Sequence, residues 1–297
     1  PQRGAEALLA RQRQPGCHPV EVRVMSAKGR KRAESPATEV AAPTAEVRLG
    51  RWEDVLADVR PHTVIVDAPF SAKTHEWGES GDRFVSDGIE RATIDFPHWT
   101  ADDVRAFVQS WAPRTSRWMV SITDDILAPA WKSAFEEAGL YAFATVGIVI
   151  AGMGVRRAAD GPASWTLHCM VARQRGRFDE NSHAVWRALP GGYFGPSGPE
   201  QAGGRGKPTW LLDALVRDYS DPGMLIVDPC AGWGSTLVSA RNAGRSAIGA
   251  EMDPAAFARC QHALSGDMTA YRRSKPARAR EADPDRPGLF DTLGATP

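Results

Sequence analysis

The sequence predicts an α/β fold with a single, mostly parallel β-sheet that carries helices on both faces. Apolar runs of strand type alternate with helix-like segments along residues 46–270, which is the pattern of such folds. One of these strands ends in a glycine-containing turn that leads directly into a helix. Hydrophobic residues make up 42% and charged residues 24% of the 297 residues, the balance of a globular domain.

The strands are expected where short apolar runs are bounded by polar or turn-forming residues. These runs cover residues 45–49, 62–66, 117–122, 141–150, 165–172, 224–228 and 247–250. The helices are expected where apolar residues recur at helical spacing, at 52–59, 100–111, 126–138, 208–219, 235–243 and 254–264. Thr100-Ala-Asp-Asp103 resembles a capping box, and Pro113 and Gly139 stop the helices that precede them.

The remaining segments predict how the chain is divided. Residues 1–45, which include the basic run 28–32, are expected to form a disordered basic tail, with phosphate contact as the alternative. Residues 271–297 are expected to form a second disordered tail. Within the domain, the polar residues 71–99 predict a long loop that acts as a lid, and 174–206 predict a short flexible linker.

Composition excludes several classes of protein. The 36 basic residues balance 36 acidic residues, so net charge alone does not indicate a nucleic-acid partner. No apolar run reaches about 18 residues, which excludes a membrane-spanning helix. The first residues lack the charged-then-apolar pattern of a signal peptide, so we do not expect secretion. The four cysteines lie far apart without a CxxC pair, which argues against disulfides and a zinc site. We therefore expect a cytoplasmic protein without a metal, and a homodimer stays open.

The most informative stretch follows the strand that ends at Asp228. A turn with Gly232 and Gly234 leads into a helix, and glycine lets the backbone turn sharply and a ligand approach closely. The next strand ends at Glu251, 19 residues after Gly232. In dinucleotide-binding folds, an acid at about this spacing accepts hydrogen bonds from ribose hydroxyls. Leu237 stands where a dinucleotide-binding motif has its third glycine, so a nucleoside-type cofactor is favoured over a dinucleotide.

A second strand also ends in an acid. Asp67 is followed by Ala68, Pro69 and Phe70. A carboxylate there accepts a hydrogen bond from an exocyclic amine, and a stiff turn can hold a backbone carbonyl against the same amine. Phe70 can stack on a flat heterocycle. An ordinary strand-to-loop turn is the alternative, but the glycine turn nearby favours an active site.

Together the two strand ends resemble the catalytic and cofactor motifs of the S-adenosylmethionine-dependent DNA amino-methyltransferases. The matching segments are Asp67-Ala-Pro-Phe70 and Asp228-Pro-Cys-Ala-Gly-Trp-Gly234, in an order that resembles the beta class of that family. The resemblance covers about residues 46–265 and implies a Rossmann-like methyltransferase fold, S-adenosyl-L-methionine as cofactor and DNA as partner.

The resemblance also implies roles for single residues. Asp67 and the backbone beside it, with Pro69 in the turn, would accept hydrogen bonds from the target amine, and Phe70 would stack on the flipped base. The residues that would line or cover the cofactor are Lys207, Pro208, Asp228, Pro229, Gly232, Gly234 and Glu251. His75 and Trp77 in the lid and Trp165 at a strand start are candidates for contact with the substrate base, with a solvent-exposed loop and a core position for Trp165 as the alternatives. Residues 174–206 would hold a small target-recognition region.

The motif also departs from the family. Ala68 stands where the family has proline, and Phe70 replaces the commoner tyrosine. An acid at the start of the motif favours adenine N6 over cytosine N4 as the methylated amine. Two alternatives stay open: a non-catalytic DNA-binding subunit that kept the fold, and a methyltransferase that acts on RNA or a small molecule.

Overall fold

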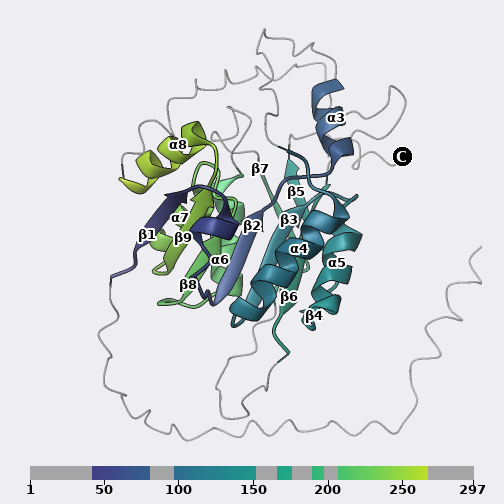
Figure 1. Ribbon diagram of the computed structural model, residues 1–297, viewed down its shortest axis with the longest axis horizontal. Coiled ribbons are helices and arrows are strands. Elements are labelled where there is room, and N and C mark those ends of the chain that lie inside the picture. The colour runs from purple at the N-terminus through teal and green to yellow at the C-terminus, as the bar shows by residue number, and fades with distance from the viewer. Residues whose placement is uncertain (1–41, 81–96, 152–165, 176–188, 197–206, 267–297) are drawn as a thin grey trace, which may run out of the picture. The chain divides into compact units, whose positions relative to one another are not determined.

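A computed structural model describes residues 42–80, 97–151, 166–175, 189–196 and 207–266, with the side chains of 77–80, 151 and 166 excepted. These residues belong to one compact unit, Ala41–Pro297. Their strands form one sheet, and helices lie against both of its faces, which confirms the predicted fold class (Figure 1). No helix in the described part of the chain is long and apolar enough to cross a membrane.

Five strands form the parallel part of the sheet. In spatial order they are β1 (Ala45–Leu49), β9 (Ser246–Glu251), β8 (Leu225–Asp228), β2 (Thr63–Asp67) and β3 (Trp118–Thr123). Beyond β3 the next two pairings are antiparallel, and the last one is parallel. The sheet continues with β6 (Thr166–Arg173), β5 (Val146–Ala151) and β7 (Gly192–Pro196), while the short β4 (Tyr141–Ala142) pairs with β6. The parallel half carries both strands that end in the motif acids.

The helices divide between the two faces of the sheet. One face is covered by α2 (Trp52–Val55), α4 (Ala101–Trp111) and α5 (Ala128–Glu137), and the other by α6 (Thr209–Tyr219), α7 (Ser235–Asn242) and α8 (Pro254–Leu264). Alternate residues of a strand point to opposite faces, so Val64 and Val66 join the first core and Ile65 joins the second. The near-continuous apolar runs of the sequence reflect this burial on both faces.

The local signals at the helix ends act as expected. Thr100 caps α4, and its side chain and that of Asp103 form both halves of a capping box. Gly139 has a φ of +78° after α5, a conformation that favours glycine. Pro113 lies in a 3₁₀ turn, Ala112–Arg114, that follows α4 directly.

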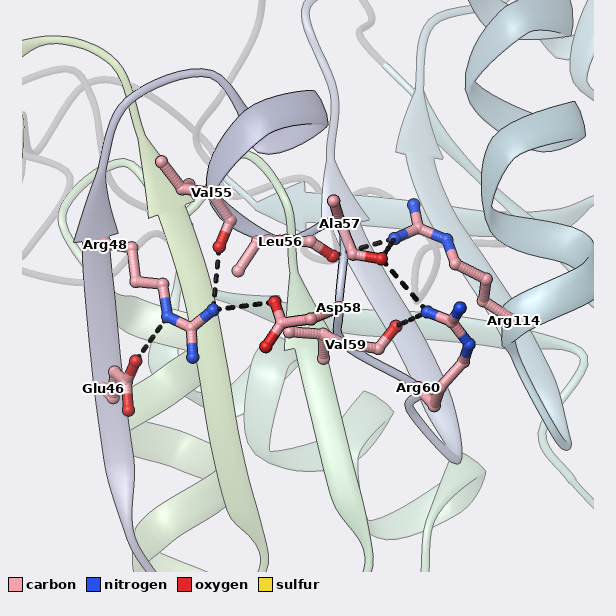
Figure 2. Close-up of polar contacts among 9 residues, drawn as sticks. All are labelled: Glu46, Arg48, Val55, Leu56, Ala57, Asp58, Val59, Arg60 and Arg114. Atoms are coloured by element: carbon pink, nitrogen blue, oxygen red, sulfur yellow. Dashed lines mark hydrogen bonds and ion pairs between the residues drawn. The ribbon is translucent and has the colours of Figure 1, made fainter.

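The helix predicted over residues 52–59 is shorter than expected and ends at Val55. Three arginines, rather than further helical turns, satisfy the backbone carbonyls of the segment that leads to β2 (Figure 2). Arg48 donates to the carbonyl of Val55, Arg114 to those of Leu56 and Ala57, and Arg60 to those of Ala57 and Val59, at 2.8–3.3 Å. Arg48 also donates through the same Nη1 to the Asp58 carboxylate and through Nε to the Glu46 carboxylate.

Three other segments differ from the sequence-based expectation. The strand expected over 141–150 is two strands, β4 and β5. The polar loop expected over 71–99 begins with a helix, α3 (Ala72–Ser80), and the linker expected over 174–206 contains β7. The two expected tails lie outside the described residues, apart from the segment 42–45 that enters β1.

Candidate active site

The two acids that end strands lie at the same edge of the sheet. β2 and β8 are parallel neighbours, paired at Thr63–Ile226 and Val64–Val227, and they run toward Asp67 and Asp228. From β8 the chain continues to β9 on one side, and from β2 it continues to β3 on the other. Ligands of open α/β sheets bind where the strand order diverges in this way. The two motif acids therefore lie at the carboxyl ends of neighbouring parallel strands.

Two glycines shape the turn after β8 for different reasons. Gly234 has a φ of +83°, and a Cβ on it would lie 2.5 Å from the Sγ of Cys260, so helix packing requires glycine there. Gly232 also has a positive φ, of +52°, but a Cβ on it would meet nothing within 4 Å. The space beside Gly232 is open, as close approach of a ligand to the backbone requires.

Glu251 holds this turn in place. One carboxylate oxygen of Glu251 accepts a hydrogen bond from the Gly232 backbone at 2.8 Å, and the other accepts one from the Asp253 backbone at 2.8 Å. Both bonds are charge-assisted, so they fix the side chain at the end of β9. The acid predicted to meet a ribose thus also shapes the glycine turn.

Asp228 is a buried acid with an unusual pKa. Its residue is 2% exposed, and this burial raises the pKa to about 7, although hydrogen bonds from the Thr236 side chain and the Cys230 backbone lower it. The negative charges of Asp67 and Glu251 raise the pKa further. A perturbed acid at a strand end, beside an open turn, is typical of a binding site.

Lys207 contacts the carboxylate of Asp67, which the sequence did not predict. Its ammonium lies 2.5 Å from Oδ2 of Asp67 and 5.1 Å from the centroid of the Phe70 ring. The side chains of Lys207 and Asp67 are 18% and 29% exposed, so the pair lies in a half-buried position. A residue expected to cover the cofactor therefore sits against the residues expected to hold the base.

The sequence also did not predict that Asp124 holds the segment after the Asp67 motif by hydrogen bonds. Buried Asp124, just after β3, accepts hydrogen bonds through Oδ2 from the Ser71 backbone, the Ser71 hydroxyl and the Thr74 hydroxyl, at 2.6–2.9 Å. Burial alone would raise the pKa of Asp124, but these bonds and one from the Leu127 backbone outweigh it and lower the pKa. The sequence signal that could have indicated Asp124 is its position at the end of a buried strand, a position that Asp67 and Asp228 also have.

The remaining motif residues of the predicted site are buried or half-buried. Ala68 is 3% exposed and packs in the core, Pro229 and Pro208 are buried, and Pro69 is half-buried beside Phe70. Pro208 precedes the first turn of α6, as its fixed φ favours. Cys230 packs against the core, and burial raises the pKa of its thiol.

The residues that the sequence predicted to contact the substrate base lie in or beside the segments that the structure leaves undescribed. His75 is half-buried on α3, with its ring 6.1 Å from that of His98, centroid to centroid. Trp77 lies on the same helix, but its side chain is not among the described ones, and Trp165 lies outside the described residues. Within the described part of the chain, no three His, Cys, Asp or Glu residues are grouped to hold a metal ion.

Comparisons with known proteins agree with the cofactor motif and with the fold. Residues 195–261, which contain α6, the glycine turn and Glu251, match the family model of the N6/N4 DNA methylases. No curated protein matches the sequence.

Solved structures of DNA methyltransferases share the fold at low identity. The M1.HpyAVI–SAM complex is 14% identical with a TM-score of 0.52, and the match covers 74% of this chain and 98% of that one. The putative DNA modification methylase TTHA0409 from Thermus thermophilus, complexed with S-adenosyl-L-methionine, is 16% identical with a TM-score of 0.53, covering 75% and 93%. The cytosine-N4-specific PvuII DNA methyltransferase is 12% identical with a TM-score of 0.51, covering 78% and 93%. The motifs, the matched family segment and the fold therefore agree, and they identify this chain as similar to the S-adenosylmethionine-dependent DNA amino-methyltransferases.

Proposed function

We propose that this protein transfers a methyl group from S-adenosyl-L-methionine to an exocyclic amine of a DNA base, with adenine N6 as the preferred target. The observation that carries this proposal is the adjacency of two strand ends: the Asp67 motif after β2 lies beside the glycine turn after β8. One strand end offers groups suited to an amine, and the other offers groups suited to a nucleoside cofactor.

The residues at the second strand end fit that cofactor. The open space beside Gly232 allows a ligand to lie against the backbone, and the half-buried Glu251 at the end of β9 has oxygens that suit ribose hydroxyls. A buried carboxylate such as Asp228 suits a ligand that carries positive charge, because ionising it without one is unfavourable. When bound, the cofactor supplies a methyl group activated by a sulfonium.

The first strand end then prepares the acceptor. Asp67 and the backbone carbonyl beside it accept hydrogen bonds from the target amine, which directs the nitrogen lone pair toward the methyl group. Positive charge develops on that nitrogen during attack, and the Asp67 carboxylate stabilises it. Phe70 stacks on the base, which has to leave the duplex to reach the site. The main contribution of the protein is alignment of the two reactants.

An acid at position 67 supports adenine as the preferred base, although the cytosine-N4-specific PvuII enzyme shares the fold. The test is to incubate the full chain with methyl-labelled S-adenosyl-L-methionine and a mixture of unmethylated genomic DNA and RNA, then separate and digest the two nucleic acids and identify the labelled nucleoside. We expect N6-methyladenine. Label in N4-methylcytosine would overturn the base preference, and label in RNA alone would overturn DNA as the substrate.

A variant with Asp67→Ala serves as the negative control, because it keeps the glycine turn and removes the proposed acceptor. Absence of transfer by the wild-type chain to any nucleic acid, with the cofactor bound, would favour the non-catalytic DNA-binding alternative.

A further inference from the structure

Lys207 contacts the two side chains that the target base is proposed to contact. Its ammonium lies 2.5 Å from Oδ2 of Asp67, at hydrogen-bond distance, and 5.1 Å from the centroid of the Phe70 ring, within cation–π range. An incoming base would need the same carboxylate for its amine and the same aromatic side chain for stacking. The two contacts come from different motif residues, so they are independent observations.

The other oxygen of Asp67 does not offer an easy alternative. Oδ1 has almost no solvent exposure and no hydrogen-bond partner among the described residues. The exposed part of the Asp67 side chain, which is 29% exposed overall, is therefore the part that Lys207 contacts. A base that arrives from solvent reaches Oδ2 first, where it meets the ammonium.

We propose that Lys207 is a positioning residue that holds the Asp67 carboxylate until the target amine displaces it, so that it competes with the base for the site. This inference rests on the proposed function, because it needs an amine as the substrate. It replaces the role of covering the cofactor, which the resemblance implied for Lys207, with a role at the acceptor.

The position of Lys207 in the chain suits displacement. Lys207 precedes α6, and the residue between them, Pro208, has an extended conformation, so no helical hydrogen bonds hold the lysine backbone. An ammonium on a flexible four-carbon stem can move without a change in the sheet or the helix. The pair is also partly open to solvent, with side chains 18% and 29% exposed, so an amine donor that arrives from solvent can replace the ammonium.

The Lys207–Asp67 ion pair stabilises the site when no base is bound. Asp67 and Glu251 each lie close enough to Asp228 for their charges to act on it, and Lys207 offsets part of this negative charge. Without a base, the ammonium keeps the Asp67 side chain in one orientation and satisfies its exposed oxygen. Base binding then exchanges one cationic or amine donor for another.

The first experiment measures steady-state kinetics of the full chain with Lys207→Met, which removes the charge and keeps the length. We expect the KM for DNA to fall about three- to tenfold, because a competitor has been removed, while kcat does not fall. The matched control is Lys132→Met, an exposed lysine on α5 that makes the same change in net charge. The control should keep wild-type constants, and Lys207→Arg should keep a high KM for DNA.

Two results would overturn the proposal. A rise in the KM for DNA would make Lys207 a DNA contact, and a rise in the KM for S-adenosyl-L-methionine alone would return it to the cofactor. Chemical rescue separates competition from a structural role. Methylammonium chloride should raise the KM for DNA of Lys207→Ala, compared with sodium chloride at equal ionic strength, and should leave Lys132→Ala unchanged.

A measurement without turnover distinguishes failure of this proposal from failure of the proposed function. In nitrogen–proton spectra of the lysine ammonium groups, the Lys207 signal is assigned by its loss in Lys207→Met. We expect a protected signal in the DNA-free protein that disappears when DNA is added. A signal absent from the free protein, or one that persists with saturating DNA, would overturn displacement even if methyl transfer is observed.

Discussion

The carboxylate of Asp124 accepts hydrogen bonds from both the backbone and the hydroxyl of Ser71, at 2.9 and 2.6 Å. Ser71 directly follows Phe70, and the Phe70 carbonyl accepts a further bond, at 3.0 Å, from the Trp99 backbone. The segment that carries the proposed acceptor residues is thus fastened to the end of β3 and to the residues that precede α4. Its conformation depends on side chains that lie far away in the sequence.

Replacing Asp124 with asparagine should loosen this segment. The amide leaves only one acceptor oxygen for four donors, and hydrogen bonds to a charged group are worth about 1.5–3 kcal/mol. We expect a lower melting temperature and a lower kcat, with the affinity for S-adenosyl-L-methionine unchanged. Thermal unfolding, kinetics and calorimetry measure the three quantities, and exposed Asp54→Asn is the control. Unchanged kcat in a destabilised variant would limit Asp124 to a structural role.

Replacing Asp67 with alanine should remove methyl transfer and spare cofactor binding. Loss of one acceptor for developing charge typically lowers the rate about 10²–10³-fold. Single-turnover rates give the first quantity and calorimetry gives the second, with Asp54→Ala as the control for charge. If the variant transfers methyl groups at the wild-type rate, the acceptor assignment of Asp67 is wrong.

Glu251→Gln and Glu251→Ala should weaken cofactor binding to different degrees. Glutamine keeps one oxygen for either Gly232 or Asp253, whereas alanine releases both backbone donors and removes the proposed ribose contact. We expect a loss on the order of 1.5–3 kcal/mol for alanine and a smaller loss for glutamine. Calorimetric titration measures both, and Glu136→Gln on α5 is the matched control. Equal affinity in all four proteins would remove Glu251 from the cofactor site.

Asp228 should make the stability of the cofactor-free protein depend on pH. Its pKa is about 7 in the folded protein against 3.8 without the fold, so the folded state binds the extra proton. The contribution of Asp228 to stability therefore decreases as the pH rises from about 4 to about 7, and it stays low above that range.

Asp228→Asn removes this penalty, because asparagine stays neutral. We expect the variant to melt at a higher temperature than the wild type at about pH 8, with the difference shrinking toward about pH 4. The same variant should bind S-adenosyl-L-methionine more weakly, which calorimetry at about pH 8 measures. A melting difference that is the same at every pH would show that Asp228 is not the titrating group.

The sequence by itself determined most of the elements of the parallel half and the two strand ends, because these depend on local patterns. Apolar runs predicted the strands, Thr100 and Gly139 marked helix ends, and the residues from Asp228 to Glu251 indicated a strand, turn, helix and strand. The adjacency of Asp67 and Asp228 was also predictable, since both end buried parallel strands. The roles proposed for these residues stay predictions.

Only the tertiary structure decided which distant side chains meet. Residues 192–196 show no strong strand pattern, yet they form β7 because β5 offers a free edge for pairing. The contact of Lys207 with Asp67 joins positions 140 residues apart, and that of Asp124 with Ser71 joins positions 53 apart. No local pattern encodes such contacts, because they form only after the strands β2, β3 and β8 have been placed side by side in one sheet.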